Sequence, residues 1–314
     1  MKILFLGSTG TIGKCLKNLL IENMYDFYAP THNECDLIDQ NNGHSGLQNL
    51  EYILSDYNIT DIISLSAVKT SIFLNKEKPA DICYHTLQMN INLFEACKRY
   101  NKLNKILHIV SSCGYPTDID LLRENDFFAG EVHESVRPHA LSKKVIYALG
   151  KFYRQQYKLP IVACCLNNVY GNCDYDKKDT FKVLDSLIVK FVDAKLTNQP
   201  SITINGTGAA RREFIYAKDA ACGILEVFKK YDGDLINVGS GYDFTVKELT
   251  ENFIRPLVGY KGEIIWLGGE DGQLRKCFEI NRMISQLGWH PPTSLVEGIQ
   301  ETINNYYEYL GVEK

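Results

Sequence analysis

The sequence predicts an α/β protein, in which a doubly wound parallel sheet is joined to a smaller C-terminal α/β domain. Two observations predict this fold class. In the N-terminal half of the chain, short β-branched and apolar runs alternate with amphipathic stretches of helical period. The runs are apolar on both faces, which is typical of strands in a sheet that helices cover on both sides.

Five strands and four helices follow from this alternation. The strands are the apolar runs KILFLG, DFYAPTH, DIISLSA, KILHIVSS and IVACCLNN, at residues 2–7, 26–32, 61–67, 105–112 and 161–168. The helices are the amphipathic stretches between them, at residues 14–22, 47–57, 79–99 and 140–156. Each of the first four strands is therefore followed by a helix, which is the order that builds a parallel sheet.

The residue composition and pattern of the sequence change after Gly171. A Lys- and Asp-rich loop leads into a helix expected at 180–195, and turn glycines then separate short strands within 202–216. The run DLINVGSG at 234–241 is typical of one more strand that returns to the first sheet. The chain of 314 residues has room for two such units. We expect a dinucleotide-binding domain over 1–168 plus about 213–240, and a substrate domain over 169–212 plus about 241–314.

Charge and cysteine content exclude several classes of protein. The formal net charge is −4, which leaves no cation excess for general binding to nucleic acid or to an anionic membrane. Ten cysteines without a CxxC pair are typical of reduced thiols. No apolar stretch approaches 18 residues, and the opening MKILFLG is too short for a signal-peptide core. We expect a cytoplasmic protein with no nucleic-acid or membrane partner and no metal site.

The glycine-rich segment after the first strand predicts a phosphate-binding turn. Gly7 permits a tight turn, Gly10 lets the backbone approach a pyrophosphate, and Gly13 allows close packing of helix on strand. The helix that follows offers free N–H groups at the positive end of its dipole. We therefore expect a Rossmann-type dinucleotide site at Gly7, Ser8, Thr9, Gly10, Thr11 and Ile12.

The end of the second strand bears on the choice between NAD(H) and NADP(H). A carboxylate there would hold the ribose 2′-hydroxyl of NAD, but the strand ends without one, at Tyr28 to His32. His32 is the nearest candidate partner of a 2′-phosphate, and an exposed loop histidine without a role is the alternative. The sequence favours NADP(H) over NAD(H), with Asp36 and Leu37 where such folds contact the adenine.

Several motifs together resemble the extended short-chain dehydrogenases/reductases, and within that group the GDP-L-fucose synthases. They are GSTGTIG, KPADICY, SSCGYP, HALSK, NNVYG, RREFIY, INVGSG and DGQLRK, and they cover nearly the whole chain. The resemblance implies hydride transfer between a nicotinamide and C4 of a nucleotide-linked 4-keto sugar, catalysed by a Ser/Tyr/Lys set. It also implies cofactor contacts at Ser66, Ala67, Lys69 and Asn92, and a homodimer.

One position departs from the catalytic pattern. By match to the family motif, Ser111, rather than Ser112, faces the substrate carbonyl, and Lys143 binds the nicotinamide ribose. The YxxxK motif reads His-Ala-Leu-Ser-Lys, so that His139 stands where the family has its tyrosine acid. Three interpretations stay open: His139 is the acid, a water relay replaces the phenol, or the proton donor has been lost, by nature or by engineering.

The resemblance also bears on epimerase activity. Cys113 matches the family's base, while an ungapped match from Tyr170 to Phe191 places Lys182 where the family has its histidine acid. Epimerisation needs one group on each face of the sugar ring with a pKa near neutrality, and an exposed lysine has a pKa of about 10.4. We expect Lys182 to bind phosphate, and the protein to be a C4 reductase with weak or no epimerase activity.

The resemblance places the substrate contacts in the second half of the chain. Asn168 and Lys182 join three basic residues that match contacts to the nucleotide diphosphate and sugar: Arg212, Arg275 and Lys276. The expected substrate is a GDP-linked 4-keto deoxyhexose or heptose. The alternatives are a bifunctional 3,5-epimerase/4-reductase and a non-catalytic NADP-binding sensor.

Overall fold

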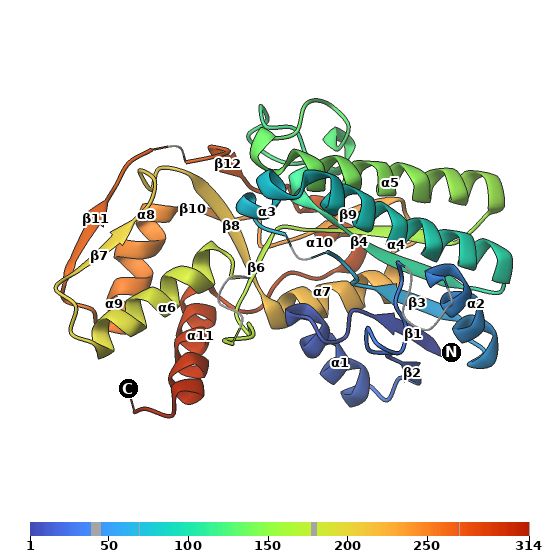
Figure 1. Ribbon diagram of the computed structural model, residues 1–314, viewed down its shortest axis with the longest axis horizontal. Helices are drawn as coiled ribbons and strands as arrows, with labels where there is room; N and C mark the ends of the chain where they lie inside the picture. The colour runs from blue at the N-terminus through green and yellow to red at the C-terminus, as the bar shows by residue number, and fades with distance from the viewer. Residues whose placement is uncertain (39–44, 69, 177–180, 270, 314) are drawn as a thin grey trace.

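The computed structural model describes residues 1–38, 45–68, 70–176, 181–269 and 271–313, which form a larger and a smaller lobe (Figure 1). The larger lobe contains a six-stranded, all-parallel sheet of order β2-β1-β3-β4-β5-β9. Its strands are β1 (Ile3–Leu6), β2 (Phe27–Tyr28), β3 (Asp61–Ser64), β4 (Lys105–Ser111), β5 (Ile161–Leu166) and β9 (Leu235–Val238).

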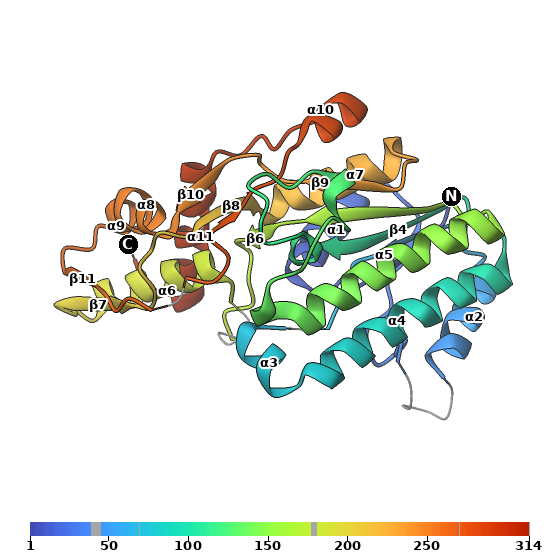
Figure 2. The same ribbon diagram turned by 90° about the horizontal axis from the view of Figure 1, so that it is seen from above.

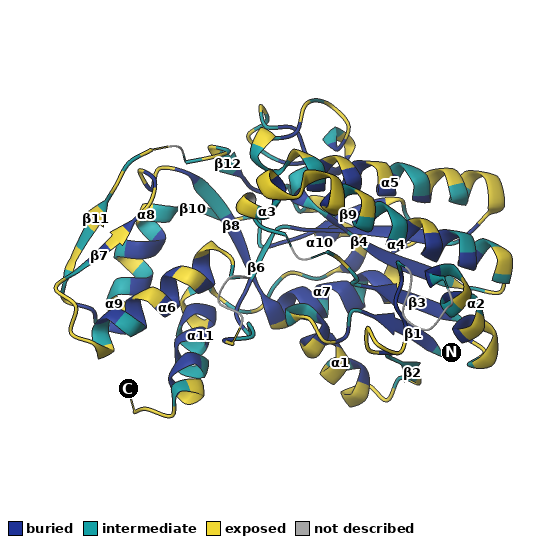
Figure 3. Ribbon diagram, viewed as in Figure 1, coloured by how far each residue is buried: buried dark blue, intermediate teal, exposed yellow. Residues whose placement is uncertain are grey.

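Helices cover both faces of this sheet. One layer consists of α2 (Gly46–Asp56), α4 (Pro79–Tyr100) and α5 (Arg137–Tyr157), which lie side by side in Figure 2. The other contains α1 (Thr11–Glu22), α7 (Ala217–Lys230) and α10 (Asn281–Leu287). The strands between the layers are mostly buried, as their dark blue colour shows in Figure 3, except the half-buried edge strand β2. The predicted fold class is confirmed, including the return of the 234–241 segment to this sheet.

The order of the strands reverses beside β1. From β1 the chain crosses to β2 on one side and then to β3 on the other, so that the carboxyl ends of β1 and β3 are adjacent. Open α/β sheets bind ligands outside the carboxyl ends of their strands at such a reversal point. The fold therefore puts the glycine turn that follows β1 at the expected ligand position.

The smaller lobe is built around two short sheets and a separate core. Strand β8 (Arg211–Tyr216) pairs with β6 (Asn168–Tyr170), β10 (Asp243–Thr245) and β12 (Arg275–Lys276), while β7 (Ser201–Ile204) pairs with β11 (Glu263–Trp266). Apolar side chains of these strands pack against surrounding helices. The helices are α6 (Val183–Leu196), α8 (Val246–Glu248), a π-helical turn (Leu249–Ile254), α9 (Arg255–Val258) and α11 (Leu295–Leu310).

Some element bounds differ from the sequence-based expectation. Strand β2 is shorter than predicted, because Pro30 has no N–H to donate and Thr31 starts a turn in which its backbone N–H and hydroxyl bind the Glu34 carboxylate. Helix α3 (Ile72–Glu77) was not predicted. In the described part of the chain, every helix is too short or too polar to cross a membrane.

Candidate active site

The predicted site residues of the first half of the chain lie at the carboxyl edge of the parallel sheet. The glycine turn follows β1, Ser66 and Ala67 follow β3, and Ser111 is the last residue of β4. Asn168 begins β6, two residues after the end of β5. Parallel strands bring these positions to one edge although they are far apart in sequence. Lys69 lies outside the described residues.

The glycine turn has the geometry that a pyrophosphate requires. Gly7 has φ +82°, a conformation that L side chains rarely adopt. A Cβ at Gly13 would lie 2.1 Å from the Gly7 carbonyl oxygen, so helix and turn touch there. Gly10 caps α1 without a side-chain hydrogen bond, which leaves N–H groups of the first turn available. Ser8 is buried, whereas Thr9 is exposed and Thr11 and Ile12 are half-buried.

The loop after β2 is held by neighbouring side chains. The Asp36 carboxylate accepts from the Ile38 N–H at 2.9 Å and lies 3.9 Å from His32, whose side chain is 71% exposed. Asn92 is buried and donates to the Leu37 carbonyl at 2.7 Å. Asn92 therefore shapes the loop on which a cofactor would rest. Its expected direct contact with the cofactor stays a prediction.

The two serines at the end of β4 have different environments. The Ser112 hydroxyl is buried and donates to Asn167 Oδ1 at 3.0 Å. Ser111 is half-buried, and its hydroxyl oxygen accepts the Cys113 N–H at 3.3 Å, which leaves its own proton to donate. Of the two, Ser111 is the one able to donate to a ligand carbonyl, in agreement with the motif match.

His139 and Lys143 lie one turn apart on the buried face of α5. Burial, together with the charges of Lys143, Lys182 and Lys276, lowers the pKa of His139 to about 3. Burial also lowers the pKa of Lys143 to about 8, and its Nζ donates to the Ile109 carbonyl at 3.2 Å. At neutral pH the imidazole is therefore uncharged, while the lysine keeps an acidic proton.

Cys113 lies against a cation from the smaller lobe. Lys276 Nζ is 3.2 Å from Cys113 Sγ, a contact that joins β12 to the segment after β4. Burial raises the pKa of the thiol, but the Lys276 ammonium and the Ser111 hydroxyl outweigh it, so the pKa is lowered overall. In Cys35, Cys97 and Cys164, by contrast, burial raises the thiol pKa. Cys113 is thus prepared to act as a thiolate.

Strand register sorts the basic residues onto two faces. Lys276 pairs with Arg212, and Arg275 pairs with Arg211, across parallel strands β12 and β8. Directly paired residues share a face and successive residues alternate, so Arg212 and Lys276 lie on one face and Arg211 and Arg275 on the other. Asp243 holds both residues of the second pair, with Oδ1 2.9 Å from Arg211 and Oδ2 2.6 Å from Arg275.

The face that Arg212 shares with Lys276 is the face that reaches Cys113. Arg212 donates to the backbone carbonyls of Arg211 and Asp271, and burial lowers its guanidinium pKa. Lys182 is exposed at the N-cap of α6, and its charge acts on both Cys113 and His139. Arg275 lies on the opposite face, where its side chain binds Asp243, and its expected substrate contact stays a prediction.

A buried carboxylate that sequence reasoning missed supports the site. Glu213 is fully buried and accepts from Asn167 Nδ2 at 2.8 Å, the Gly241 N–H at 3.0 Å and the Phe278 N–H at 2.6 Å. Asn168 Nδ2 donates to the Glu213 carbonyl oxygen at 2.9 Å, so Asn168 braces the strand from here. The signal in the sequence is an acidic residue within the otherwise apolar end of RREFIY.

We expect Lys276→Met to raise the pKa of the Cys113 thiol, because the substitution removes the ammonium that lowers this pKa while burial still raises it. Alkylation of Cys113 by iodoacetamide at about pH 7.5 should slow by about tenfold, as followed by mass spectrometry of the peptide that contains it. Exposed Lys14→Met is the control. An unchanged alkylation rate in Lys276→Met would show that the cation does not stabilise the thiolate.

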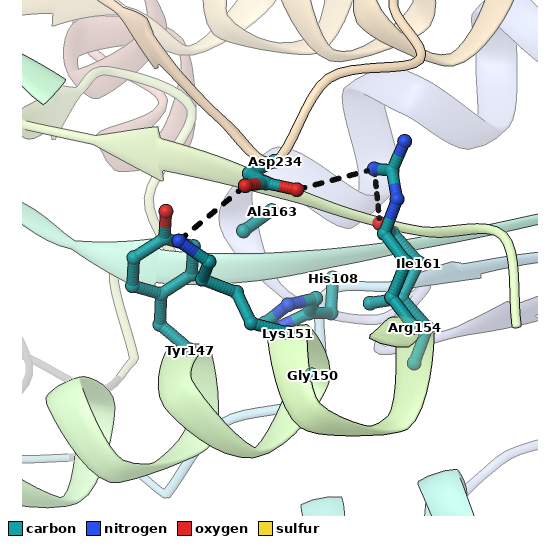
Figure 4. Close-up of a pocket in the computed structure, with 8 residues that line it drawn as sticks. All are labelled: His108, Tyr147, Gly150, Lys151, Arg154, Ile161, Ala163 and Asp234. Carbon is teal, nitrogen blue, oxygen red and sulfur yellow. Dashed lines mark hydrogen bonds and ion pairs between the residues drawn. The ribbon is translucent and has the colours of Figure 1, made fainter. Parts of the chain in front are cut away.

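A second buried histidine belongs to packing and not to the site. His108 lines a cavity of about 10 Å³ between β4, β5 and α5, with the Lys151–Asp234 and Arg154–Asp234 ion pairs beside it (Figure 4). Neither ring nitrogen has a hydrogen-bond partner among the described residues, and burial lowers the pKa of His108 to about 3. The cavity has room for about one water molecule, so it is too small for a substrate.

The model of the NAD dependent epimerase/dehydratase family matches residues 3–239. A GDP-L-colitose synthase of Yersinia pseudotuberculosis is 30% identical over 310 residues, which cover 96% of each protein. A probable GDP-L-fucose synthase 1 of Oryza sativa subsp. japonica is 29% identical over 98% of this chain and 92% of its own length.

A solved structure has the same fold over nearly the whole chain. It is a GDP-mannoheptose C4 reductase from Campylobacter jejuni with NADP bound, similar with a TM-score of 0.85 at 24% sequence identity. The similarity covers 98% of this chain and 98% of that one. At this level of sequence identity, the comparison shows that the two proteins share a fold.

Proposed function

Because the chain belongs to the NAD dependent epimerase/dehydratase family, as its motifs predicted, we propose that it is an NADPH-dependent C4 reductase of a GDP-linked 4-keto sugar. The substrate class is a deoxyhexose or a heptose. One observation carries the proposal: the 3.2 Å contact between Lys276 and Cys113 brings the basic face of β8 and β12 beside the strand end that bears Ser111. The basic residues that would bind the sugar nucleotide and the residues that would act on its carbonyl group can therefore form one site.

The larger lobe would hold the dinucleotide. The turn from Gly7 to Gly13 fits a pyrophosphate, because side chains are excluded at both glycines and the α1 N–H groups are uncapped. Exposed His32 lies where a 2′-phosphate would sit, and Asp36 is held by a backbone N–H. NADP is the cofactor in the heptose reductase structure from C. jejuni, which supports NADP(H) here. The cofactor, when bound, supplies the hydride that reaches C4.

The domains of this proposal follow the two lobes except at α10, which lies within 241–314 but packs against β9 and α7 of the larger lobe. Residues 1–168 with about 213–240 hold the dinucleotide, and residues 169–212 with about 241–314 hold the sugar nucleotide. Strand β8 runs across the boundary between these parts and leads into α7 of the larger lobe. The reacting carbonyl would thus lie between groups contributed by both.

The proton that completes the reduction would come from Lys143. Ser111 donates a hydrogen bond to the ketone oxygen, which becomes an alkoxide as C4 accepts the hydride. In this relay, neutral His139 would donate its ring N–H to the same oxygen and accept a proton from Lys143 on its other ring nitrogen. Lys143 lies one helical turn away, and its Nζ would leave the Ile109 carbonyl to give that proton. The alcohol forms, the imidazole stays neutral, and Lys143 ends as an amine, so charge and protons balance. The Lys143 pKa of about 8 suits a general acid at neutral pH.

The diphosphate would be bound by Arg212 and Lys276, with Lys182 at the rim. Arg212 is half-buried and its planar guanidinium suits two-point contact with phosphate oxygens. Lys276 is buried, and Lys182 is the exposed N-cap of α6. The three cations converge although the net charge of the chain is −4.

Epimerase activity would be weak or absent, because only one of the two required groups is favourable. The lowered thiol pKa prepares Cys113 as a base. The group for the opposite face of the ring, Lys182, is exposed and is assigned to phosphate. The lowered thiol pKa nevertheless favours a second candidate function, a bifunctional 3,5-epimerase/4-reductase, which the description of the matching family also supports.

The outward face of α4 and α5 supports a homodimer. Apolar side chains lie exposed at spacings of four and seven residues along both helices: Tyr84, Ile91, Leu141, Val145 and Phe152. Two adjacent helices with such stripes can pair with a second copy as a four-helix bundle. We expect Val145→Glu combined with Phe152→Glu to give a monomer by sedimentation equilibrium, with the parent protein a dimer. A monomeric parent protein would contradict the assignment.

The test of function is a screen of GDP-linked 4-keto sugars with NADPH and with NADH, with NMR of the product at C3, C4 and C5. We expect NADPH oxidation and a new C4 alcohol, with C3 and C5 unchanged. Inverted C3 and C5 would establish the bifunctional enzyme. Tight NADPH binding without reduction of any sugar would identify a sensor and overturn the proposal.

A further inference from the structure

We propose that Asn75 is a positioning residue for His139, since its side chain caps the first turn of α5. The two residues are 64 positions apart, and Asn75 Oδ1 accepts the backbone N–H of His139 at 3.2 Å. This role rests on the proposed function, because it concerns the geometry of the proposed proton relay. Asn75 acts through the backbone of His139.

Helix α5 needs such a cap because its own sequence supplies none. The N-cap residue is Val136, which has no polar side chain, and Pro138 in the first turn has no N–H. The N–H of His139 therefore lies at a buried helix start without an intrahelical acceptor. A residue from another segment of the chain satisfies it.

The Asn75 side chain is itself fixed at its other end. It is 4% exposed, and its amide nitrogen donates to Thr70 Oγ1 at 2.6 Å and to the Ser71 carbonyl at 2.9 Å. Both ends of one amide are thus used, and a rotation of the amide would break three hydrogen bonds. The side chain is a rigid link between the start of α3 and the start of α5.

This link joins two parts of the proposed site. The segment that contains Thr70 and Ser71 follows Ser66 and Ala67, the proposed cofactor contacts after β3. The segment at its other end carries His139. Among the described residues, His139 Nδ1 has no hydrogen-bond partner, so no hydrogen bond at this nitrogen fixes the ring. The packing of the buried side chain and the position of the backbone to which Asn75 is bound remain to set the ring's place. The distance between cofactor and imidazole is then set in part by one asparagine.

The experiment compares Asn75→Leu, which removes the acceptor, with Asn75→Asp, which keeps it. We expect Asn75→Leu to lower kcat by about tenfold or more, with KM for NADPH and sugar nucleotide changed by less than about threefold. Asn75→Asp keeps the acceptor for the His139 N–H but loses both hydrogen bonds of the amide nitrogen, so its kcat should fall between that of the parent and that of Asn75→Leu. Ser294→Ala, which removes a cap from α11 far from the site, controls for a general loss of stability. It should lower Tm without lowering kcat.

Hydrogen exchange tests the link independently of activity. Asn75→Leu should speed amide exchange in the first turn of α5, and not at the start of α11. In the parent protein, addition of NADPH should slow exchange together in the segment 70–75 and in the first turn of α5, which needs no variant to fold. If no sugar is reduced, the proposed function fails, while this result still decides the link. Unchanged exchange, or a kcat of Asn75→Leu within about twofold of the parent, would overturn the proposal.

Discussion

Replacement of Lys143 by methionine is expected to lower kcat for C4 reduction by about 10²- to 10⁴-fold. Methionine keeps much of the buried side-chain volume but has no proton to give. The neutral imidazole of His139 then has no donor behind it, because burial holds its pKa at about 3. KM for the sugar nucleotide should change much less. Single-turnover NADPH oxidation in a stopped-flow instrument measures the effect on the chemical step.

Lys144 provides the matched control for this substitution. It is the next residue of α5, it is also buried, and its Nζ donates to the Gly130 carbonyl at 2.7 Å, away from His139. Lys144→Met should therefore keep kcat within about threefold of the parent value. Equal losses in the two variants would show that the effect of Lys143→Met is structural.

Replacement of Arg212 by methionine is expected to raise KM for the sugar nucleotide by about 30-fold or more. A half-buried guanidinium that contacts a diphosphate is worth about 2 kcal/mol or more when its partner is left unpaired. NADPH affinity should be unaffected, because the cofactor turn lies in the other lobe. Steady-state kinetics and equilibrium binding of GDP measure the change.

Arg211→Met is the control, since Arg211 precedes Arg212 in the same strand and points to the opposite face. Its guanidinium is held by Asp243, so its loss should change Tm more than KM. The strand register places Arg212 and Arg211 on opposite faces of β8. Equal effects of the two variants on KM would contradict the assignment of substrate binding to the Arg212 face and of a structural role to the Arg211 face.

Much of the larger lobe could be predicted, because the sequence patterns that indicate its elements are local. The glycine turn, the alternation of apolar runs with helices and the spacing of His139 and Lys143 are all readable within about ten residues of sequence. Predicted strand 26–32 failed for a local reason as well, the turn between Thr31 and Glu34 that ends β2 early.

The rest depends on contacts between distant segments. Arg212 and Arg275 look alike in sequence, and only the register of β12 against β8 separates them into different faces. The Cys113–Lys276 contact spans 163 positions, and the Asn75 cap of α5 spans 64. The lowered pKa of His139 likewise follows chiefly from burial by tertiary packing, with smaller contributions from the charges of Lys143, Lys182 and Lys276.

The central claim is that a neutral His139 relays a proton from Lys143 to the C4 oxygen. Its most direct test is the pH dependence of kcat for C4 reduction, measured in single turnovers from about pH 6 to about pH 9.5. The donor is present below the pKa of Lys143, about 8, and is lost above it. We expect a plateau from about pH 6 to about pH 7.5 and then a fall of about tenfold per pH unit. A rate that already falls as pH rises through about 6.5 would identify an imidazolium as the acid and contradict this account.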